Sequence, residues 1–381
     1  MELLCLDSNY REIDVVNDLI SIIWTDRYYA PGDFELVVPL TAANVTKYAL
    51  NSRLGRSDSK EVMTISKQEI RDDKLILTGK SLLNWLAKRY AGREYDSLQS
   101  NDPRYLFNNG LNNDLIGVSG YTQLDIYAVK SAISNLTRNG SLSGSGPTIN
   151  YNISKEDSLL DQYQRIAKAA AMGIRIYLDS VDDAGVYSLK YDAYFGQDRR
   201  ITQTTNAPIS LSEKSGDIRN VSAVKSNEKT IDLVTVHANK LLGTSPGGTY
   251  LGNLETTVSV LQNRTVVSLN DTNPIILGPD AQFKNILRTD LTVDNFTTVS
   301  ELQDELKKTA FEELDKWETV NLIDFELTTP LPIKYGIDYG LGDLITVNTN
   351  FAGSVSSRVT EIIYSKDETG EKEYPTIEIV S

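Results

Sequence analysis

Few residues in this chain have the types and spacing that active-site chemistry requires. His237 is the only histidine, so a His-His metal site is excluded and a Ser-His-Asp arrangement would depend on this one residue. It lies in VTVHANK, where it alternates with apolar residues along an expected strand, and we interpret it as an ordinary half-buried strand residue. Cys5 is the only cysteine, which excludes an intrachain disulfide and a cysteine-cluster zinc site.

Adjacent carboxylates occur at Asp72-Asp73, Asp182-Asp183 and Glu312-Glu313. A glycosidase needs two carboxylates that face each other across the bond to be cleaved. The first two pairs lie in expected hairpin turns and the third on the polar face of an expected helix, so turn formation and solvation explain them. The sequence therefore predicts no catalytic residues.

Two loops resemble ligand sites in composition only. The stretch NGSLSGSGP lacks the lysine of a phosphate-binding loop and reads as a flexible loop. In residues 179–185, Val181 stands where a calcium loop needs its third oxygen ligand. We predict no metal site and no cofactor, and we expect the protein not to be an enzyme.

The composition is that of an acidic chain with ample apolar residues. Its 381 residues exceed what one core usually reaches and 40% of them are hydrophobic, so we expect two to four domains. The net charge of −14 argues against specific DNA binding. The N-terminal MELLCLDSNYRE lacks the positive start of a secretory signal, and no run reaches the roughly 18 to 20 apolar residues of a membrane span. We therefore expect synthesis in a cytoplasm and no membrane segment.

The elements that would position any site are mostly strands. Up to about residue 90, apolar and alternating runs predict strands at 3–6, 19–27, 33–38, 62–70 and 75–78, the last two joined by a polar turn. Ser81 opens an expected short helix with Leu82, Trp85 and Leu86 at helical spacing. The apolar side of this helix is expected to close one end of a small barrel.

Helix and strand patterns mix between about residues 91 and 200. Helices are expected from Thr122 to Asn139 and from Ser154 onward, the second ended by Gly173 in a left-handed conformation. Strands are expected at 174–178 and 186–194. After residue 201 the expected elements are strands at 221–225, 231–237, 256–261 and 265–269, a helix at 301–317, and strands at 344–347, 359–364 and 376–380.

The two ends of the chain repeat a pattern. VMTISKQEIRDDKLILTG at 62–79 and RVTEIIYSKDETGEKEYPTIEI at 358–379 each consist of an expected strand, a charged turn and a second strand. Two explanations stay open, because hairpins with charged turns are common: a duplicated β-domain, or two unrelated hairpins. A duplicated domain would let three chains build a ring with pseudo-sixfold symmetry.

One segment has more aromatic residues than a strand can bury. IIWTDRYYAPGDFELVVPL at 22–40 reads as a hairpin around Pro31-Gly32, and no single strand face can bury the residues that cluster at its turn end. The candidate interface residues of the chain come from this segment and are Trp24, Arg27, Tyr28, Tyr29 and Phe34. Either a neighbouring subunit covers them, since aromatic residues are favoured in interface cores, or they pack inside their own barrel.

Blocks at both ends of the sequence resemble one known family. LDSNYREID, IIWTDRYYAPGDFEL, VMTIS and LILTGKSLLNWLAKRY near the start, with YGLGDLITV and RVTEI near the end, resemble the baseplate hub, or tail-associated, proteins at the tail tip of siphophages. These in turn are similar to the hub of contractile-tailed phages. The middle of the chain, roughly 91–330, contributes only matching architecture.

The resemblance implies a fold class and domains. The class is α+β, mostly β, with two β-barrel-like tube domains and inserted and appended α+β modules. The expected domains are a first tube domain at 1–95 plus 201–240, an inserted α+β domain at 96–200, and a second β-rich tube domain at 241–381 with a helix at 300–317.

The resemblance also implies a structural, non-catalytic role. It predicts a homotrimer in the virion tail tip, a ring that continues the tail tube, takes part in host attachment and gates DNA exit during genome ejection. Expected partners are the distal tail protein ring, receptor-binding or fibre proteins and the tape-measure protein, with DNA passing through unbound. The alternatives are a carbohydrate-binding host-adhesion module, which the 20 tyrosines would suit, and a wall hydrolase.

Overall fold

The structure is a computed structural model, in which the chain forms two compact units. Unit 1 comprises Met1–Ala223 and Leu322–Ser381, and unit 2 comprises Val224–Asn321. The described residues are 2–7, 10–89, 95–100, 104, 136–138, 149–153, 157–181, 187–226, 231–241, 253–261, 266–268, 286–291, 299–315, 320–328, 333–351 and 353–380. Across these ranges no helix has the length and apolar character needed to cross a bilayer.

A sheet of 13 strands dominates unit 1, so the expected fold class, α+β and mostly β, is confirmed. The strand order is β14-β19-β22-β21-β3-β4-β7-β6-β5-β1-β2, with β20 beside β21 and β13 beside β20. The strands are β1 Leu3–Leu6, β2 Glu12–Val15, β3 Ser21–Arg27, β4 Asp33–Pro39, β5 Arg53–Arg56, β6 Val62–Arg71, β7 Lys74–Ser81, β13 Ser210–Ser212, β14 Ile218–Ser226, β19 Val320–Leu327, β20 Leu344–Thr349, β21 Gly353–Asp367 and β22 Gly370–Ile379.

This sheet contains one strand order twice. The first module, β3-β4-β7-β6-β5, and the second module, β14-β19-β22-β21-β20, have the same neighbours when their strands are matched in chain order. The hairpins β6–β7 and β21–β22 also share a register shift in their first strand, between Ile65 and Lys67 and between Val359 and Glu361. The repeated order favours a duplicated β-domain over two unrelated hairpins.

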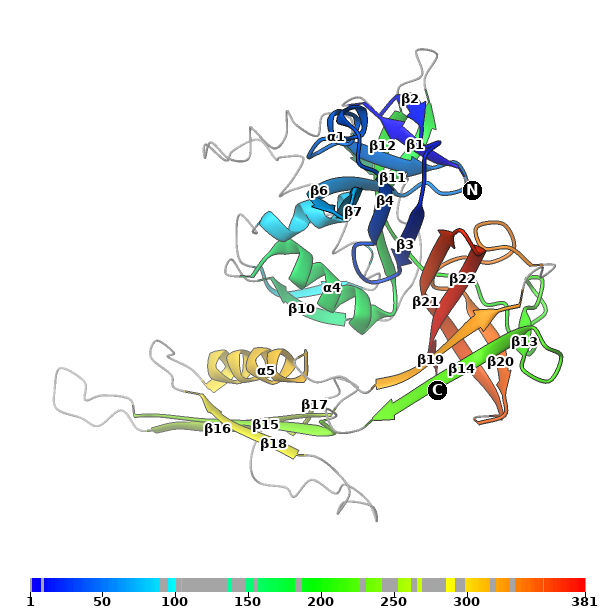
Figure 1. Cartoon of the computed structure of the whole chain (residues 1–381). Coiled ribbons are helices and arrows are strands. Elements are labelled where there is room, and N and C mark those ends of the chain that lie inside the picture. The colour runs from blue at the N-terminus through cyan, green and yellow to red at the C-terminus, as the bar shows by residue number, and fades with distance from the viewer. Residues whose placement is uncertain are drawn as a thin grey trace. The chain divides into compact units, whose positions relative to one another are not determined.

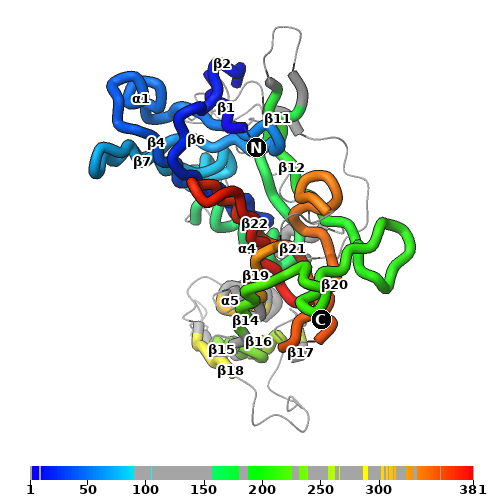
Figure 2. Tube along the Cα trace, turned by 45° about the vertical axis from the view of Figure 1, so that its right-hand side comes forward, coloured from blue at the N-terminus to red at the C-terminus, as the bar shows by residue number. Residues whose placement is uncertain are grey.

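The two modules join where β3 pairs with β21 in an antiparallel ladder from Arg27↔Glu361 to Ile22↔Lys366. Figure 2 shows the red trace of the chain's end beside the blue trace of its beginning. Segments more than 330 residues apart in sequence therefore belong to one sheet, since Arg27 and Glu361 are separated by 334 positions.

Each module has its own apolar core. The first core is formed by side chains of the first module and β1, among them Ile22, Trp24, Phe34, Leu36, Leu54, Met63, Ile65 and Leu77. The second core is formed mainly by the second module, among them Ile218, Ile323, Phe325, Ile345, Val347, Val359, Ile362 and Ile377. Each core also takes one aromatic residue from the other module, Tyr364 in the first core and Tyr28 in the second.

A third core of unit 1 lies between short helices and a smaller sheet. The sheet has the order β11-β12-β9, with β11 Gly173–Val181, β12 Tyr187–Tyr194 and β9 Leu136–Arg138. The helices are η1 Leu82–Lys88 and α4 Leu159–Ala170, and a two-stranded sheet of β8 Tyr95–Ser100 and β10 Ile149–Ile153 accompanies them. Helix α1, Ala42–Lys47, connects β4 to β5, with Thr41 as its N-cap.

The helix after Ser81 differs from its prediction. It is a 3₁₀ helix, and Ser81 does not cap it, because the Ser81 hydroxyl accepts the N–H of Gly32 at 3.1 Å instead. Its Leu82, Leu83 and Leu86 belong to the core that contains α4 and β11, where the prediction had a lid on the barrel.

The ends of α4 also differ from the prediction. The N-cap is Ser158 and not Ser154, because the Ser158 hydroxyl accepts the N–H of Asp161 at 3.1 Å. The left-handed residue at the end is Ala171, with φ 52°, and not Gly173, which already belongs to β11. The helix expected from Thr122 lies outside the described residues up to its last turn, where 136–138 form strand β9.

Unit 2 is a four-stranded sheet with one helix on it. The order is β17-β16-β15-β18, with β15 Leu233–Leu241, β16 Asn253–Leu261, β17 Val266–Ser268 and β18 Ile286–Leu291. Helix α5, Val299–Asp315, lies along β15 and β16 in Figure 1. The helix expected at 301–317 is thus present, and its apolar Leu302, Leu306, Ala310 and Leu314 are buried against the sheet, while Trp317 lies outside the described residues.

The unit boundaries do not coincide with the three expected domains. Unit 2 begins within β14 and ends within β19, so the chain leaves the second module between its first two strands and returns there. The assignment of 1–95 plus 201–240 and of 241–381 to two tube domains, with 96–200 inserted, stays a prediction. Asp182-Asp183 and the NGSLSGSGP loop lie outside the described residues.

Candidate functional site

Tyr28 stands at the centre of the best-defined polar region of the chain. Its side chain is fully buried, and its hydroxyl lies 3.2 Å from the carbonyl oxygen of Ala171 and 3.1 Å from that of Tyr194, while it accepts the N–H of Gly196 at 3.3 Å. Its backbone N–H donates to the carbonyl of Thr360 at 2.9 Å. Through its side chain, Tyr28, the residue after β3, thus bonds to the segment before β11 and to the end of β12, and through its backbone it bonds to β21.

Glycines make room for the Tyr28 ring. A Cβ on Gly173 or on Gly342 would lie 2.3 Å from a ring carbon of Tyr28, and Gly342 also has a φ of +87°. Gly342 belongs to the YGLGD block near the chain's end, and Tyr28 belongs to the IIWTDRYYAPGDFEL block near its start. The two sequence blocks that carry the family resemblance therefore contact each other in the fold.

The five candidate interface residues differ in how much of their surface is exposed to a partner. Trp24, Tyr28 and Phe34 are buried within the single chain, with exposed fractions of 0%, 0% and 3%. Arg27 and Tyr29 keep part of their surface: Arg27 pairs with Asp33 and Glu361, and the Tyr29 hydroxyl donates to Glu378 at 3.1 Å. An intersubunit contact in this segment stays a prediction, and Arg27 and Tyr29 are the two residues that could make it.

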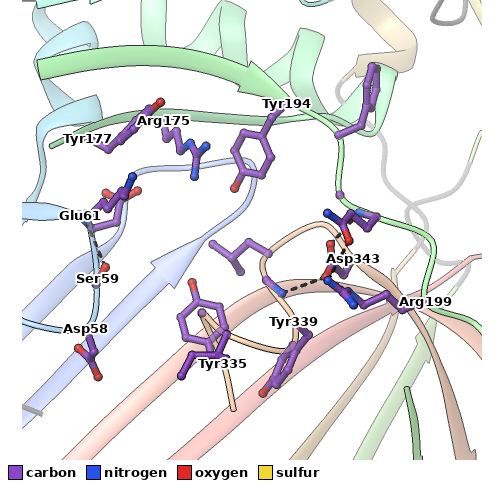
Figure 3. A pocket seen from close by; sticks show the side chains of 18 of the residues that line it. Asp58, Ser59, Glu61, Arg175, Tyr177, Tyr194, Arg199, Tyr335, Tyr339 and Asp343 are labelled. Atoms are coloured by element: carbon purple, nitrogen blue, oxygen red, sulfur yellow. Dashed lines mark hydrogen bonds and ion pairs between the residues drawn. The ribbon is translucent and has the colours of Figure 1, made fainter. Parts of the chain in front are cut away.

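A pocket of about 670 Å³ opens beside the Tyr28 region. Its walls are residues 57–61 between β5 and β6, Arg175 and Tyr177 of β11, residues 194–199 after β12, and residues 335–343 before β20. All four segments belong to unit 1. Figure 3 shows the side chains of Arg175, Tyr194 and Tyr335 pointing into the pocket.

Asp343 fixes one wall of this pocket. It is 5% exposed, and its carboxylate accepts the backbone N–H of Gln197 at 2.7 Å, that of Gly340 at 3.0 Å and Nε of Arg199 at 2.9 Å. Three N–H donors from two different segments fix the position of this carboxylate. The YGLGD block therefore has two structural functions, since Gly342 receives the Tyr28 ring and Asp343 fastens the segment after β12.

Arg175 lies between two aromatic rings on the opposite wall. Its guanidinium carbon is 4.4 Å from the ring centre of Tyr177 and 4.3 Å from that of Tyr194. One terminal nitrogen is 3.3 Å from the Asp192 carboxylate, while Nε is buried and has no hydrogen-bond partner in the described part of the chain. Stacking on both faces holds this guanidinium in place at the pocket wall.

Glu61 supplies the most perturbed acid of the pocket. The pKa of the Glu61 carboxyl is raised to about 8, chiefly by burial and also by the charge of Asp26, while Arg175 opposes both effects. Burial also raises the pKa of Asp26, which accepts Nε1 of Trp24 at 2.8 Å and lies 3.7 Å from the Arg56 guanidinium. Glu61 is therefore mostly protonated at neutral pH, and it is then a neutral hydrogen-bond donor.

Sequence reasoning did not find this pocket. Glu61, Arg175 and Tyr194 are far apart in sequence, and none lies in a recognised motif. The only available signal was the YGLGD block, of which Asp343 forms part of the wall. His237, in contrast, has the predicted place: it is half-buried on β15, with Nδ1 3.0 Å from the Thr257 hydroxyl.

Comparisons with known proteins agree with the fold. No curated protein sequence matches the chain. The 43 kDa tail protein of prophage MuSo2 from Shewanella oneidensis is similar in structure, with a TM-score of 0.51 at 10% identity over 99% of this chain and 98% of that chain. The tail protein from Neisseria meningitidis MC58 has a TM-score of 0.50 at 10% identity, over 100% of this chain and 96% of that chain.

At this identity the two structures establish a shared fold, and the family is established by sequence. The family described as Siphovirus ReqiPepy6 Gp37-like protein matches residues 2–377. This match covers both resemblance blocks and the region between them, so the resemblance to siphophage tail proteins is confirmed. The chain belongs to the Siphovirus ReqiPepy6 Gp37-like family.

Proposed function

We propose that this protein is a structural, non-enzymatic hub of a siphophage baseplate, located at the tail tip of the virion. In this proposal it forms a homotrimeric ring that continues the tail tube, connects the tube to the receptor-binding apparatus and gates DNA exit. Its partners are the distal tail protein ring, receptor-binding or fibre proteins and the tape-measure protein.

The repeated strand order in unit 1 is the observation that supports this proposal most. Two modules with the order β3-β4-β7-β6-β5 and β14-β19-β22-β21-β20 give three chains six similar modules. Six similar modules suit a ring that is threefold by chain and nearly sixfold by module, and closed cyclic symmetry is common among homo-oligomers. Both structural relatives reported above are themselves described as tail proteins.

The charge of the chain is compatible with DNA passing through such a ring. The net charge is −14 per chain, and a trimer would carry three times that charge. Phosphates are held by clusters of lysine and arginine, and an acidic assembly disfavours such contacts. A conduit of this kind lets DNA move without stopping it at a specific site.

Native mass spectrometry of the purified full chain, with negative-stain imaging of the same sample and of virion tail tips, tests the proposal. The expected results are a trimer mass and a ring with threefold symmetry. A monomer at every concentration, together with tail tips that lack a threefold ring containing this chain, would refute the proposal.

A charge reversal tests the predicted interface. Arg27→Glu is expected to lower the trimer fraction, while the matched control Arg71→Glu, at the exposed end of β6, should leave it unchanged. Thermal melting of both variants separates lost assembly from lost folding. Equal trimer fractions in the two variants would remove Arg27 from the interface.

A further inference from the structure

The pocket of unit 1 has the size and the aromatic surface of a ligand site. Its volume of about 670 Å³ lies within the roughly 300–1,000 Å³ that small-molecule sites usually have. Tyr194, Phe195 and Tyr335 contribute rings to its walls, and Phe195 stays 37% exposed. The guanidinium carbon of Arg104 lies 5.3 Å from the ring centre of Phe195, so a ligand can stack only on the other face of this ring. The half-buried rings of Tyr194 and Tyr335 place further apolar surface beside polar groups.

Most charges around the pocket are compensated within the protein; the exception in the described lining is Lys60, whose ammonium lies 5.8 Å from the ring centre of Tyr177. Arg199 pairs with Asp343 at 2.9 Å, Arg56 pairs with Asp58 at 2.9 Å, and Arg175 lies 3.3 Å from Asp192. A bound anion or cation would have to compete with these internal partners. The pocket therefore favours a ligand that is polar but uncharged.

Several polar groups of the pocket have no partner of their own. Arg175 Nε is buried without a hydrogen bond, and neither the Glu61 carboxyl nor the Tyr194 hydroxyl makes a hydrogen bond to any described residue. The half-buried Glu61 carboxyl and Tyr194 hydroxyl can gain, from a ligand that supplies hydroxyl or carbonyl groups, the hydrogen bonds that no described residue gives them. Hydroxyl groups suit this mixture of donors and acceptors, because each hydroxyl both donates and accepts.

From these features we propose that the pocket binds a neutral oligosaccharide. The C–H faces of the sugar rings would stack on Phe195 and Tyr335, and sugar hydroxyl or carbonyl groups would bond to Arg175, Glu61 and Tyr194. The inference does not depend on the proposed hub function: a ring can form without this site, and the site can bind without the ring.

An oligosaccharide array on the full chain tests the chemical class. The probes include chitotriose and maltotriose as neutral trisaccharides and trigalacturonate as an acidic one of the same length. At least one neutral oligosaccharide is expected to bind, and the acidic one at least tenfold more weakly. The absence of any neutral binder, or equal binding of the acidic trisaccharide, would overturn the proposal.

Two phenylalanines provide a matched pair of variants for the best neutral binder. Phe195→Ala is expected to weaken binding about tenfold, the loss that about 1.4 kcal/mol of stacking would give. Phe351→Ala removes an equally apolar ring that is 76% exposed outside the pocket, and should leave binding unchanged. Equal losses in both variants, or no loss in Phe195→Ala, would overturn the assignment of binding to this pocket.

A second pair of variants tests the hydrogen bonds at Glu61. Glu61→Gln keeps a neutral donor at the same place and should bind within about threefold of the unchanged protein, which 0.65 kcal/mol or less would account for. Glu61→Leu removes the polar group and should lose about tenfold, the loss of one good hydrogen bond. Urea unfolding of both variants checks that the fold persists, and equal binding by the Gln and Leu variants would contradict the role of Glu61.

Discussion

The two modules of unit 1 have the same strand order and differ in what connects the strands. In the first module, five residues at 28–32 link β3 to β4, and α1 lies between β4 and β5. In the second module, unit 2 lies between β14 and β19, and residues 328–343 lie between β19 and β20. The connection between the first two strands is therefore five residues in the first module and a whole unit in the second, whereas the next connection, 40–52 in the first module and 328–343 in the second, differs little in length.

The connections of the second module contain the residues that build the pocket wall and receive the Tyr28 ring. The 335–343 segment supplies Tyr335, Asp343 and Gly342, which build the pocket wall and receive Tyr28. Connections tolerate insertion because they lie outside the strand ladder, and binding residues often lie on such segments. The common strand order is therefore the scaffold, and its connections give the modules different tasks.

The modules are nevertheless not independent of each other. Tyr364 of β21 packs in the first core opposite Trp24, and Tyr28 of the β3 end packs in the second core. Both exchanges occur at the β3·β21 ladder. We therefore expect the two modules to unfold together.

The largest expected effects come from matched truncations in the two cores. Ile65→Ala in the first core and Val359→Ala in the second each remove a fully buried side chain just before the register shift of its hairpin. Each should lower the free energy of unfolding, by about 3 kcal/mol and about 2 kcal/mol respectively. Both should move one common urea transition, followed by far-UV circular dichroism and by tryptophan fluorescence.

The most informative part of this test is how the fluorescence transition, to which Trp24 of the first core contributes, responds to a change in the second core. If Val359→Ala left the fluorescence transition in place while the circular dichroism transition moved, the modules would be independent. Ile70→Ala serves as the control, because Ile70 is 62% exposed on β6. It should change the free energy of unfolding by less than about 0.5 kcal/mol.

A glycine substitution tests the contact between the modules directly. Gly342→Ala places a Cβ 2.3 Å from the Tyr28 ring at a φ of +87°, so the free energy of unfolding should fall by about 2–3 kcal/mol. Gly340→Ala, two residues earlier, has no atom within 4 Å of the new Cβ and should be nearly neutral. Urea unfolding measures both variants, and a Gly342→Ala protein as stable as the Gly340→Ala protein would show that the Tyr28 contact is dispensable.

Much of the fold could be predicted because strand patterns are local. The β3, β4, β6, β7 and β21 strands all overlap their predicted ranges, and Asp72 and Asp73 form the predicted turn with φ values of 47° and 59°. Alternation of apolar residues is a property of a few neighbouring positions, and so is the left-handed turn that aspartate tolerates. The echo between the two hairpins was also readable, since it depends on the same local patterns.

The parts that could not be predicted depend on contacts between distant residues. Gly173 looked like a helix cap, but Ala171 takes the left-handed conformation and Gly173 is needed for the Tyr28 ring. Ser81 looked like a cap, but Gly32 uses its hydroxyl. The pocket escaped prediction for the same reason, because Glu61, Arg175 and Tyr194 come together only when β11 and β12 pack beside the first module.

The free energy of unfolding is expected to depend on pH through Glu61, the pocket carboxyl with the raised pKa. Because the pKa of Glu61 is raised to about 8 in the folded protein, the folded state binds more protons than the unfolded state between about pH 4.5 and 8. This contribution to stability is therefore present below pH 4.5 and is lost as the pH rises through 8. Asp26, whose pKa is also raised by burial, adds a loss of the same sign; Arg175 opposes the shift of Glu61, and Arg56 opposes that of Asp26.

The variant Glu61→Gln isolates the contribution of this one carboxyl to the pH dependence of the free energy of unfolding. Gln resembles the protonated acid, so the variant should match the unchanged protein near pH 5 and exceed its free energy of unfolding near pH 9 by on the order of 1–2 kcal/mol. Urea unfolding at both pH values measures the difference. A difference that does not change between pH 5 and pH 9 would mean that Glu61 is ionised in the folded state throughout.

The smallest expected effect compares an ion pair across the modules with one inside a module. Glu361→Gln removes the partner of Arg27 across the β3·β21 ladder, and Glu371→Gln removes the partner of Lys366 within the β21–β22 hairpin. Arg27 and Glu361 are 29% and 23% exposed and Arg27 also keeps Asp33, so Glu361→Gln should cost about 0.5–1 kcal/mol, less at high salt. Glu371→Gln, in a more exposed pair, should cost less than about 0.3 kcal/mol. If urea unfolding showed the same loss of stability in both variants, the ladder between the modules would be stabilised only by its backbone hydrogen bonds and by the packing of Tyr28 and Tyr364. Arg27 would then be available to a neighbouring subunit.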